Sequence, residues 1–267
     1  MSFRILHDRF KKLKRAFLIW TTLILLLVYL WIDNVRFTIF GTKTNKKSRV
    51  QIRRAKWFTN QLINLGSAFI KIGQLLSARP DLIPNTWIKE LSKLQDQVPY
   101  FAFKHVEETI REELGSKFNE IDQIICDPVG SASLAQVHRA TLKNGKKVVF
   151  KVQRPNLKEL FIIDLGIMQQ IAGLLQKNKN WSRGRNWVEI AKECRKVLMK
   201  ELDFNCEAQY AARFRQQFLD DEYVQVPEVI WDMSSEKVLC LSYLEGTKIS
   251  DLEKLQSKEI DLPKIAE

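Results

Sequence analysis

Sixteen consecutive residues near the N-terminus are almost entirely apolar, and this run restricts the possible folds more than any other segment. It reads FLIWTTLILLLVYLWI, covers residues 17–32, and has Lys14 and Arg15 before it and Arg36 after it. As an α-helix it would be about 24 Å long, shorter than the roughly 30 Å hydrocarbon core of a bilayer. Long basic side chains at both ends can reach the headgroups and compensate for the difference. The run therefore predicts a single N-terminal membrane segment.

A signal peptide and a buried core helix are the two alternatives for this run. A signal peptide would need a small-x-small cleavage site after the apolar residues, and none follows. A core helix would not need cationic flanks, which favour contact with anionic lipid headgroups. Trp20, Tyr29 and Trp31 also suit a membrane interface. Basic residues on both sides leave the orientation of the segment open.

The net charge of +12 is confined to the N-terminal part of the chain. Residues 1–56 contain 14 of the 43 lysines and arginines but two of the 31 acidic residues, so the remainder carries 29 charges of each sign. A nucleic-acid-binding domain would carry its basic excess on the folded body, so we expect membrane lipids and no nucleic acid as partners. We expect basic flanks and the membrane segment at 1–36 and a basic linker at 37–56.

The cysteines and histidines give no sign of a disulfide framework or a metal site. The four cysteines have no short paired spacing, which favours a reducing compartment: Cys126, Cys194, Cys206 and Cys240. The three histidines are far apart in the sequence: His7, His105 and His138. Structural zinc sites need such ligands at short spacings, so we assign no metal ligand.

Residues 57–118 are predicted as a helical extension. Between Trp57 and Ser77 apolar residues recur every three or four positions, which predicts one amphipathic helix. Its polar face carries Lys71 and Gln74 of the run Lys-Ile-Gly-Gln (71–74), and the glycine in this run costs about 1 kcal/mol relative to alanine. That face is either simply solvated, or it covers a site to which Gly73 permits close approach. Pro80 and Pro84 end the helix, and further helices are predicted near 85–95 and 103–114.

Residues 119–267 have a different pattern, which predicts an antiparallel sheet with helices. Two β-type runs within 128–156 are joined by Asn144-Gly145, a strong hairpin signal. A first strand enters through Ile124 and Ile125, giving three antiparallel strands. Helices are predicted at about 157–177 and 187–218, and two more strands at 224–231 and 237–246. The fold class is therefore α+β.

The sheet presents a loop and a lysine that suit phosphate binding. The loop PVGSAS at 128–133 is made of small residues, so its backbone N–H groups could approach phosphate oxygens closely. Lys151 in the following strand could neutralise those oxygens, and an acidic residue on a helix could orient it: Glu201, Asp203 or Glu207. The alternative is a solvated strand lysine and an ordinary polar helix surface.

Four motifs together resemble the UbiB/AarF family of atypical, kinase-like ATPases. They are KIGQ (71–74), PVGSASLAQVH (128–138), VVFKVQRP (148–155) and ELDFNCEA (201–208), in the family's order over residues 55–267. The resemblance implies a protein-kinase-like N-lobe with a helical N-terminal extension, and Mg²⁺ and ATP as cofactors. It also implies a link to ubiquinone and related isoprenoid-quinone biosynthesis at membranes, with quinone precursors or quinone-biosynthesis proteins as partners.

The resemblance assigns roles to individual residues. Lys71 and Gln74, with Gly73 between them, match a motif that lies over the nucleotide pocket and occupies the space of a protein substrate. Lys71, Gln74 and three further residues are the expected catalytic set: Lys151, Glu201 and Asp203. The expected nucleotide-binding residues are Lys151, the phosphate loop, the acid beside the lysine, and the hinge: Gly130, Ser131, Ala132, Ser133, Glu207, Tyr243, Leu244 and Glu245.

The sequence departs from the family pattern after the hinge. No His follows His138, so no His-x-Asp catalytic loop is present, and Asp203-Phe204 is followed by Asn205 rather than Gly. We therefore expect an N-lobe without its C-lobe, as a fragment of a longer chain rather than a truncated product without catalytic capacity. A non-catalytic membrane scaffold or pseudokinase is the main alternative. A conventional membrane-anchored protein kinase would need a glycine-rich loop and an open peptide groove.

Overall fold

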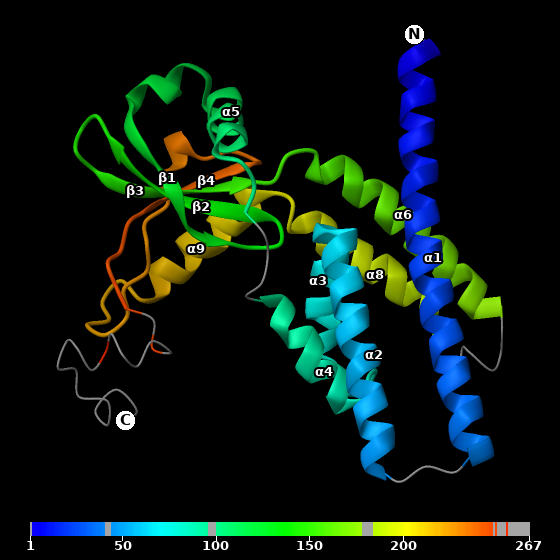
Figure 1. Ribbon diagram of the computed structural model, residues 1–267. Helices are drawn as coiled ribbons and strands as arrows, with labels where there is room; N and C mark the ends of the chain where they lie inside the picture. Colours follow the sequence, from blue (N-terminus) through cyan, green and yellow to red (C-terminus); the bar gives the residue numbers. More distant parts are fainter. Residues whose placement is uncertain are drawn as a thin grey trace.

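The computed structural model describes residues 2–40, 44–95, 100–177 and 184–247, together with Ile249 and Leu255. The described residues form two neighbouring parts, a set of packed helices and a sheet with a helix on each face (Figure 1). Residues 248–267, beyond the expected hinge, lie outside the described residues except for those two positions.

The helical part begins with a long helix that packs against two others. Helix α1 (Ser2–Phe40) runs beside α2 (Thr44–Leu65) and crosses α6 (Leu157–Lys177) (Figure 1). The remaining helices of this part are α3 (Ser67–Ser77), α4 (Asn85–Leu91), the short 3₁₀ helix η1 (Ser92–Gln95) and α8 (Trp187–Lys200). Among the described residues, Phe10–Ile39 of α1 is long and apolar enough to cross a membrane, with a mean hydropathy of 2.1.

Two buried ion pairs fasten α1 to its neighbours. Arg15 forms a bidentate pair with Asp164 of α6, at 2.7 Å and 2.6 Å, and also donates to the carbonyl of Leu65. Nearer its other end, Asp33 accepts two hydrogen bonds from Arg54 of α2. The helix is thus packed along the protein on one side and exposes apolar side chains on the other.

Three helix predictions differ from the structure. The helix expected over 187–218 is divided into α8 and a second helix, Phe204–Gln217, by a turn at residues 201–203. Residues 37–56, expected as a linker, lie in the end of α1 and the first half of α2 on either side of 41–43. Lysine, arginine and glutamine are good helix formers, so a basic segment need not be irregular. The helix expected over 57–77 is divided at Gly66, whose φ of +89° falls in the region that glycine adopts readily. Helices at 85–95 and 103–114 are confirmed.

The sheet confirms the predicted antiparallel hairpin. Within the described residues its four strands lie in the order β1 (Ile121–Ser131), β2 (Ala135–Leu142), β3 (Lys147–Gln153) and β4 (Val238–Ser242). The β2–β3 turn contains Gly145 at φ +82°. The strand predicted at 224–231 is wrong: Val229 makes only an isolated bridge with Leu241, because Pro227 has no N–H and the chain enters the 3₁₀ helix η3 (Trp231–Met233).

The two faces of the sheet are covered by different helices (Figure 1). Helix α5 (Phe103–Leu114), which continues into the 3₁₀ helix η2 (Gly115–Glu120), packs against Val148, Phe150 and Val152. Helix α9 (Phe204–Gln217) packs against the opposite face, where Phe204 and Ala208 contact Leu239. Alternate residues of β3 therefore point to opposite faces, and Lys151 points toward α9.

Candidate functional site

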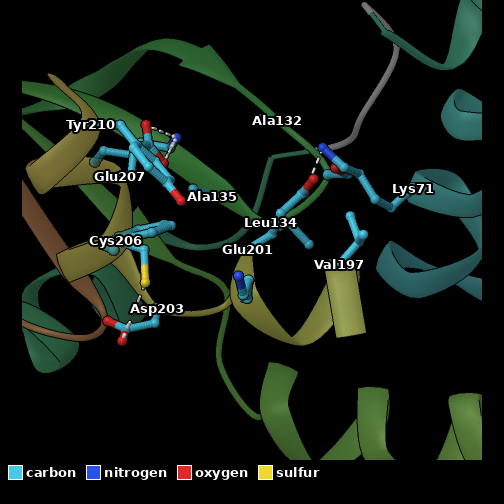
Figure 2. Close-up of a pocket in the computed structure, with 14 residues that line it drawn as sticks. Lys71, Ala132, Leu134, Ala135, Val197, Glu201, Asp203, Cys206, Glu207 and Tyr210 are labelled. Carbon is cyan, nitrogen blue, oxygen red and sulfur yellow. Dashed lines mark hydrogen bonds and ion pairs between the residues drawn. The ribbon is translucent and has the colours of Figure 1, made fainter. Parts of the chain in front are cut away.

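A cavity of about 410 Å³ lies where the sheet meets the helical part. It is lined from α3 by Lys71, from β3 by Lys151, from the β1–β2 loop by residues 132–135, and from the α8–α9 region by residues within 197–210. Figure 2 shows Glu207 and Tyr210 of α9 on one side of the cavity and Lys71 on the other. The cavity therefore brings together motifs that are far apart in the sequence.

Lys151 is held by a carboxylate on α9. Its Nζ lies 2.6 Å from Glu207 Oε1 and 2.7 Å from Oε2, and 5.0 Å from the centre of the Phe204 ring. Glu207 lies in the first turn of α9, where the helix dipole stabilises a negative charge. The lysine side chain is 25% exposed, so its ammonium group is oriented by the protein but still open to the cavity.

Lys71 forms the second ion pair of the cavity. Its Nζ lies 2.6 Å from Oε2 of Glu201, the residue that ends α8 (Figure 2). The two side chains are 24% and 31% exposed. Because α3 belongs to the helical extension and Glu201 immediately precedes α9, this pair joins the extension to the sheet-bearing part across the cavity.

The turn between Glu201 and Asp203 is fixed from both ends. Asp203 caps α9 by accepting a hydrogen bond from the backbone N–H of Asn205 at 2.9 Å. Leu202 is buried, and its carbonyl accepts a hydrogen bond of 2.7 Å from Gln153 Nε2 at the end of β3. Gln153 is a positioning residue that our sequence analysis missed, although it stands in the quoted run VVFKVQRP.

The small-residue loop is closed by an arginine from the same run. Ala132 N–H donates to the carbonyl of Ala135 at 2.8 Å, which makes the tight turn between β1 and β2. Arg154 donates to Ser131 Oγ at 3.0 Å and to the Ala132 carbonyl at 3.2 Å, and its burial lowers its pKa from the ordinary value. A Cβ placed on Gly130 would meet no atom within 4 Å, so internal packing does not require a glycine there.

The expected residues divide into those that line the cavity and those that do not. Ala132 and Ser133 line it with the two lysines and three acids named above, whereas Gly130 and Ser131 lie just before them in β1. Gln74 is turned away: its Nε2 donates to the Leu94 carbonyl at 2.8 Å. Gly73 is buried and packs against Leu94 and Leu62, so its close approach is to the helical core.

The expected hinge residues follow β4 at the edge of the described region. Tyr243 donates its backbone N–H to the carbonyl of Lys147 at 3.1 Å. Leu244 and Glu245 are exposed, and neither they nor Tyr243 line the cavity. The structure therefore brings the lysines, the acids and the small-residue loop together, but leaves the hinge outside.

The cavity lining carries ammonium groups that an anion could contact, and equal numbers of lysines and carboxylates. Its lining contains three lysines and three carboxylates, of which Lys71 and Lys151 are already paired with Glu201 and Glu207. Within the described ranges, no group of three or more His, Cys, Asp or Glu side chains could hold a metal ion. Ammonium groups beside a loop of small residues can bind phosphate oxygens if the ion pairs rearrange.

Comparisons with known proteins place this chain in a family. Residues 93–267 match the ABC1 atypical kinase-like domain. The protein ACTIVITY OF BC1 COMPLEX KINASE 7, chloroplastic, of Arabidopsis thaliana is 40% identical over 97% of this chain and 37% of its own length. The probable protein kinase UbiB of Marinobacter nauticus is 37% identical over 77% of this chain and 38% of its own length. The chain thus spans less than half the length of the curated relatives it matches.

A solved structure supports the kinase-like fold. The chain is similar to Rv3197 of Mycobacterium tuberculosis, solved in complex with erythromycin, with a TM-score of 0.50 and 29% identity. The similarity covers 71% of this chain and 47% of that one. With the domain match, this confirms the expected α+β, kinase-like fold with a helical extension. The chain belongs to the UbiB/AarF family of ABC1 atypical kinase-like proteins.

Proposed function

We propose that this chain is the ATP-binding lobe and helical extension of a membrane-associated atypical kinase or ATPase. We further propose that the whole protein supports the biosynthesis of ubiquinone or another isoprenoid quinone. Support for the first part comes from the family and from the cavity; support for the second comes from the family resemblance and from relatives named UbiB.

The Lys151–Glu207 pair is the observation that carries the proposal. In protein kinases a strand lysine paired with a helix glutamate contacts the phosphates of the nucleotide. Here the strand and the helix are β3 and α9, and both glutamate oxygens lie within 2.7 Å of the lysine Nζ. Glu207 would orient the ammonium group, and Lys151 would neutralise phosphate oxygens.

The other cavity residues fit a nucleoside triphosphate. The volume of about 410 Å³ lies in the usual range for small-molecule sites. Ala132 and Ser133 present backbone and small side chains toward the cavity, where bulky residues would exclude a phosphate. Lys71 would cover the bound nucleotide, and Glu201 would hold the Lys71 side chain in place. ATP, when bound, supplies the phosphoryl group for transfer or hydrolysis.

The described residues do not by themselves form a magnesium site. Glu201 and Glu207 are paired with lysines, and Asp203 caps α9. Mg²⁺ needs several oxygen ligands in octahedral geometry, and these three carboxylates do not provide them. We propose Mg²⁺ as a cofactor of the whole protein only, because kinase-like folds hold the ion with residues of the C-lobe.

Helix α1 is the proposed membrane segment. It combines an exposed apolar surface with lysines near one end, at Lys11, Lys12 and Lys14. Such a surface binds lipid through apolar burial and attraction to anionic headgroups. Membrane association through α1 would hold the cavity close to lipid-soluble quinone precursors, the proposed partners.

Nucleotide binding by the intact protein tests the proposed site. Lys151→Ala is expected to weaken Mg-ATP binding at least tenfold in calorimetric titrations, because a charged contact to phosphate is lost. Lys147→Ala is the matched control, since Lys147 lies on the same strand and is exposed. Unchanged affinity in a folded Lys151→Ala protein would overturn the nucleotide site and favour a membrane scaffold.

A second measurement separates the nucleotide site from the pathway. Cells that lack the gene would be complemented with the wild type or with Lys151→Ala, and their isoprenoid quinones would be quantified. Restoration by the wild type alone supports the proposal. Normal quinone levels without the gene would contradict the role in quinone biosynthesis while leaving ATP binding intact.

A further inference from the structure

A second cavity of about 480 Å³ lies between helices α1, α2 and α4. Most of its lining is apolar and comes from α1, α2, the end of α3, α4 and the segment between α3 and α4: Leu26, Leu30, Phe58, Leu76, Ile83 and Trp87. It shares no lining residue with the cavity that contains Lys71 and Lys151. It is therefore a separate candidate binding site.

The charged residues of this second cavity neutralise each other. Arg54 contacts Asp33 through two hydrogen bonds, of 2.7 Å and 3.1 Å, and both side chains are mostly buried. The Arg54 guanidinium also lies 4.1 Å from the Tyr29 ring, which packs edge-on against Trp57. With its charge and one face occupied, Arg54 is poorly placed to recruit a phosphate or a carboxylate.

Two neutral amides complete the polar part of the lining. The side chains of Asn34, which is exposed, and of Gln51, which is half-buried, line the cavity beside the ion pair. Neither side chain forms a hydrogen bond with another described residue. Each amide offers donors and an acceptor, so together they can satisfy a neutral polar group that both donates and accepts. A hydroxyl or a carbonyl meets that requirement.

The cavity continues into the exposed surface of α1. Leu30 lines the cavity and is 42% exposed, and the neighbouring Leu27 and Trp31 are 40% and 66% exposed. If α1 contacts a membrane, this continuity would give a lipid-soluble molecule a short apolar path into the cavity. An apolar chain could lie along the leucines while its head reaches Asn34 and Gln51.

We propose that this second cavity binds a neutral amphiphile, with an apolar chain or ring and a hydroxyl or carbonyl head. The ligand comes either from the bilayer or as a free small molecule, and the chemistry recognised is the same. The proposal does not depend on ATP binding, because the two cavities have no residue in common.

A long-chain alcohol carrying a photoactivatable diazirine is the probe for the intact protein. Saturable crosslinks are expected on peptides of α1, α2 and α4, with competition by the unlabelled alcohol. Gln51→Leu should weaken binding about fivefold to tenfold, because one hydrogen bond to the head is lost. Gln216→Leu on α9 is the matched control and should leave binding unchanged.

A cavity-filling variant tests the same site without changing its polar groups. Ile83→Trp should block crosslinking, whereas Ile190→Trp on α8, which is 42% exposed, should not. Unsaturable crosslinks spread over the outer face of α1, or binding unaffected by both Gln51→Leu and Ile83→Trp, would overturn the proposal. If an alkyl phosphate of the same chain length binds more tightly than the alcohol, the ligand's head group is not neutral and that part of the proposal is wrong.

The source of the ligand is distinguished by how the probe is presented. Saturable crosslinking by the monomeric alcohol in buffer would show that the cavity takes up its ligand from solution without a bilayer. Crosslinking that occurs only when the alcohol is dissolved in phosphatidylcholine vesicles identifies the bilayer as the source. Both results support the cavity as the site, provided that Ile83→Trp abolishes the crosslinks.

Discussion

Lys71 of α3 and Glu201 at the end of α8 form an ion pair of 2.6 Å across the cavity that contains Lys151. The pair connects the helical extension to the turn that precedes α9, and α9 carries Glu207. Two ammonium groups thus face one cavity, each paired with its own carboxylate. Lys71 is positioned by the helical extension and Lys151 by the sheet. Movement of the extension would therefore displace the Lys71 ammonium group and leave that of Lys151 in place.

A double-mutant cycle should reveal coupling between Lys71 and Glu201. The side chains are partly exposed, so we expect about 0.5–1 kcal/mol of interaction in the free energy of unfolding. Lys71→Ala, Glu201→Ala and the double variant would be compared with the wild type by denaturant unfolding. Additive effects would mean that the pair contributes nothing to stability. The pair Lys192–Glu189 on α8, whose side chains are 58% and 56% exposed, gives a reference.

Replacement of Gly73 by alanine should destabilise the protein despite the better helix propensity. The added Cβ would collide with Leu94 Cδ1 and lie 2.9 Å from Leu62 Cδ1, and both leucines are buried. Overpacking costs roughly 1–3 kcal/mol, and the better helix propensity of alanine offsets about 1 kcal/mol of that. We therefore expect the free energy of unfolding to fall by about 1 kcal/mol, which thermal unfolding would measure.

Gly173 of α6 provides the control for that substitution. A Cβ there would meet no atom within 4 Å, so Gly173→Ala should stabilise the protein by about 0.5–1 kcal/mol. If Gly73→Ala stabilises as much as Gly173→Ala, the leucines adjust freely. Close packing would then not explain why the motif contains a glycine.

Local chemistry made some elements predictable from the sequence. Asn144-Gly145 predicted the β2–β3 turn because a tight hairpin needs positive φ, and Gly115 marked the end of α5 for a similar reason. The break at Gly66 was missed because the apolar pattern continues across it. Periodicity reports which residues are buried, not whether the axis of a helix changes direction.

Long-range contacts explain what was missed in the site. The order of motifs predicted that Lys151 would meet an acid on a helix, and Glu207 does so. No local pattern predicts that Gln153 holds the Leu202 carbonyl or that Arg154 closes the loop at Ala132. Gln74 looks solvated in a helical projection, yet it bonds to Leu94 because α3 and η1 fold against each other.

Loss of Arg15 should be costly because it leaves a buried carboxylate without its partner. Asp164 is 1% exposed and accepts hydrogen bonds from Nε and Nη2 of Arg15. We expect Arg15→Leu to lower the free energy of unfolding by about 3 kcal/mol at pH 7.5. Lys14→Leu, at an exposed neighbouring position, should change it by less than about 0.5 kcal/mol.

The pH dependence of the Arg15→Leu defect identifies its cause. Burial raises the pKa of Asp164 above its ordinary value, and removal of Arg15 removes the groups that lower it. A carboxyl with a raised folded-state pKa is favoured below its unfolded pKa and loses stability as pH rises through the folded pKa. The defect should therefore shrink between pH 7.5 and pH 5. A constant defect would attribute it to lost packing.

His138 should make the protein less stable in mild acid. Burial lowers its pKa, and Nδ1 bonds to the Ile125 carbonyl at 2.9 Å while Nε2 contacts Gln136 at 3.0 Å. The unfolded state then binds a proton more readily than the folded state, so stability falls as pH drops below about 6.5. The loss is at most about 1.4 kcal/mol per pH unit.

Unfolding at pH 7.5 and pH 5.5 measures this contribution. The free energy of unfolding should change between the two pH values by about 1 kcal/mol less in His138→Gln than in the wild type. His105→Gln serves as the control because the His105 side chain is exposed and contacts Glu108 at the surface of α5. An unchanged pH dependence in His138→Gln would assign the acid sensitivity to carboxylates.

The exposed face of α1 should bind membranes without release of the helix from the protein. Arg15 and Asp33 tie α1 to α6 and α2, so crossing a bilayer would require burying those partners or breaking both pairs. An in-plane position keeps the pairs and still buries Phe17 and Trp31, which are 68% and 66% exposed. We therefore expect the docked helix to lie along the membrane surface.

Vesicle pelleting tests this arrangement with the intact protein. Replacing Lys11, Lys12 and Lys14 by glutamine should lower binding to anionic phosphatidylglycerol vesicles at least tenfold, because each surface lysine contributes about 1 kcal/mol. Binding to phosphatidylcholine should change little, whereas Phe17→Ser with Trp31→Ser should reduce binding to both. Since an in-plane helix is held by charge and exposed apolar area alone, high salt with the serine variants should release the protein. Resistance to carbonate and salt extraction would instead show that α1 crosses the bilayer, with its ion pairs to α6 and α2 either buried there or broken.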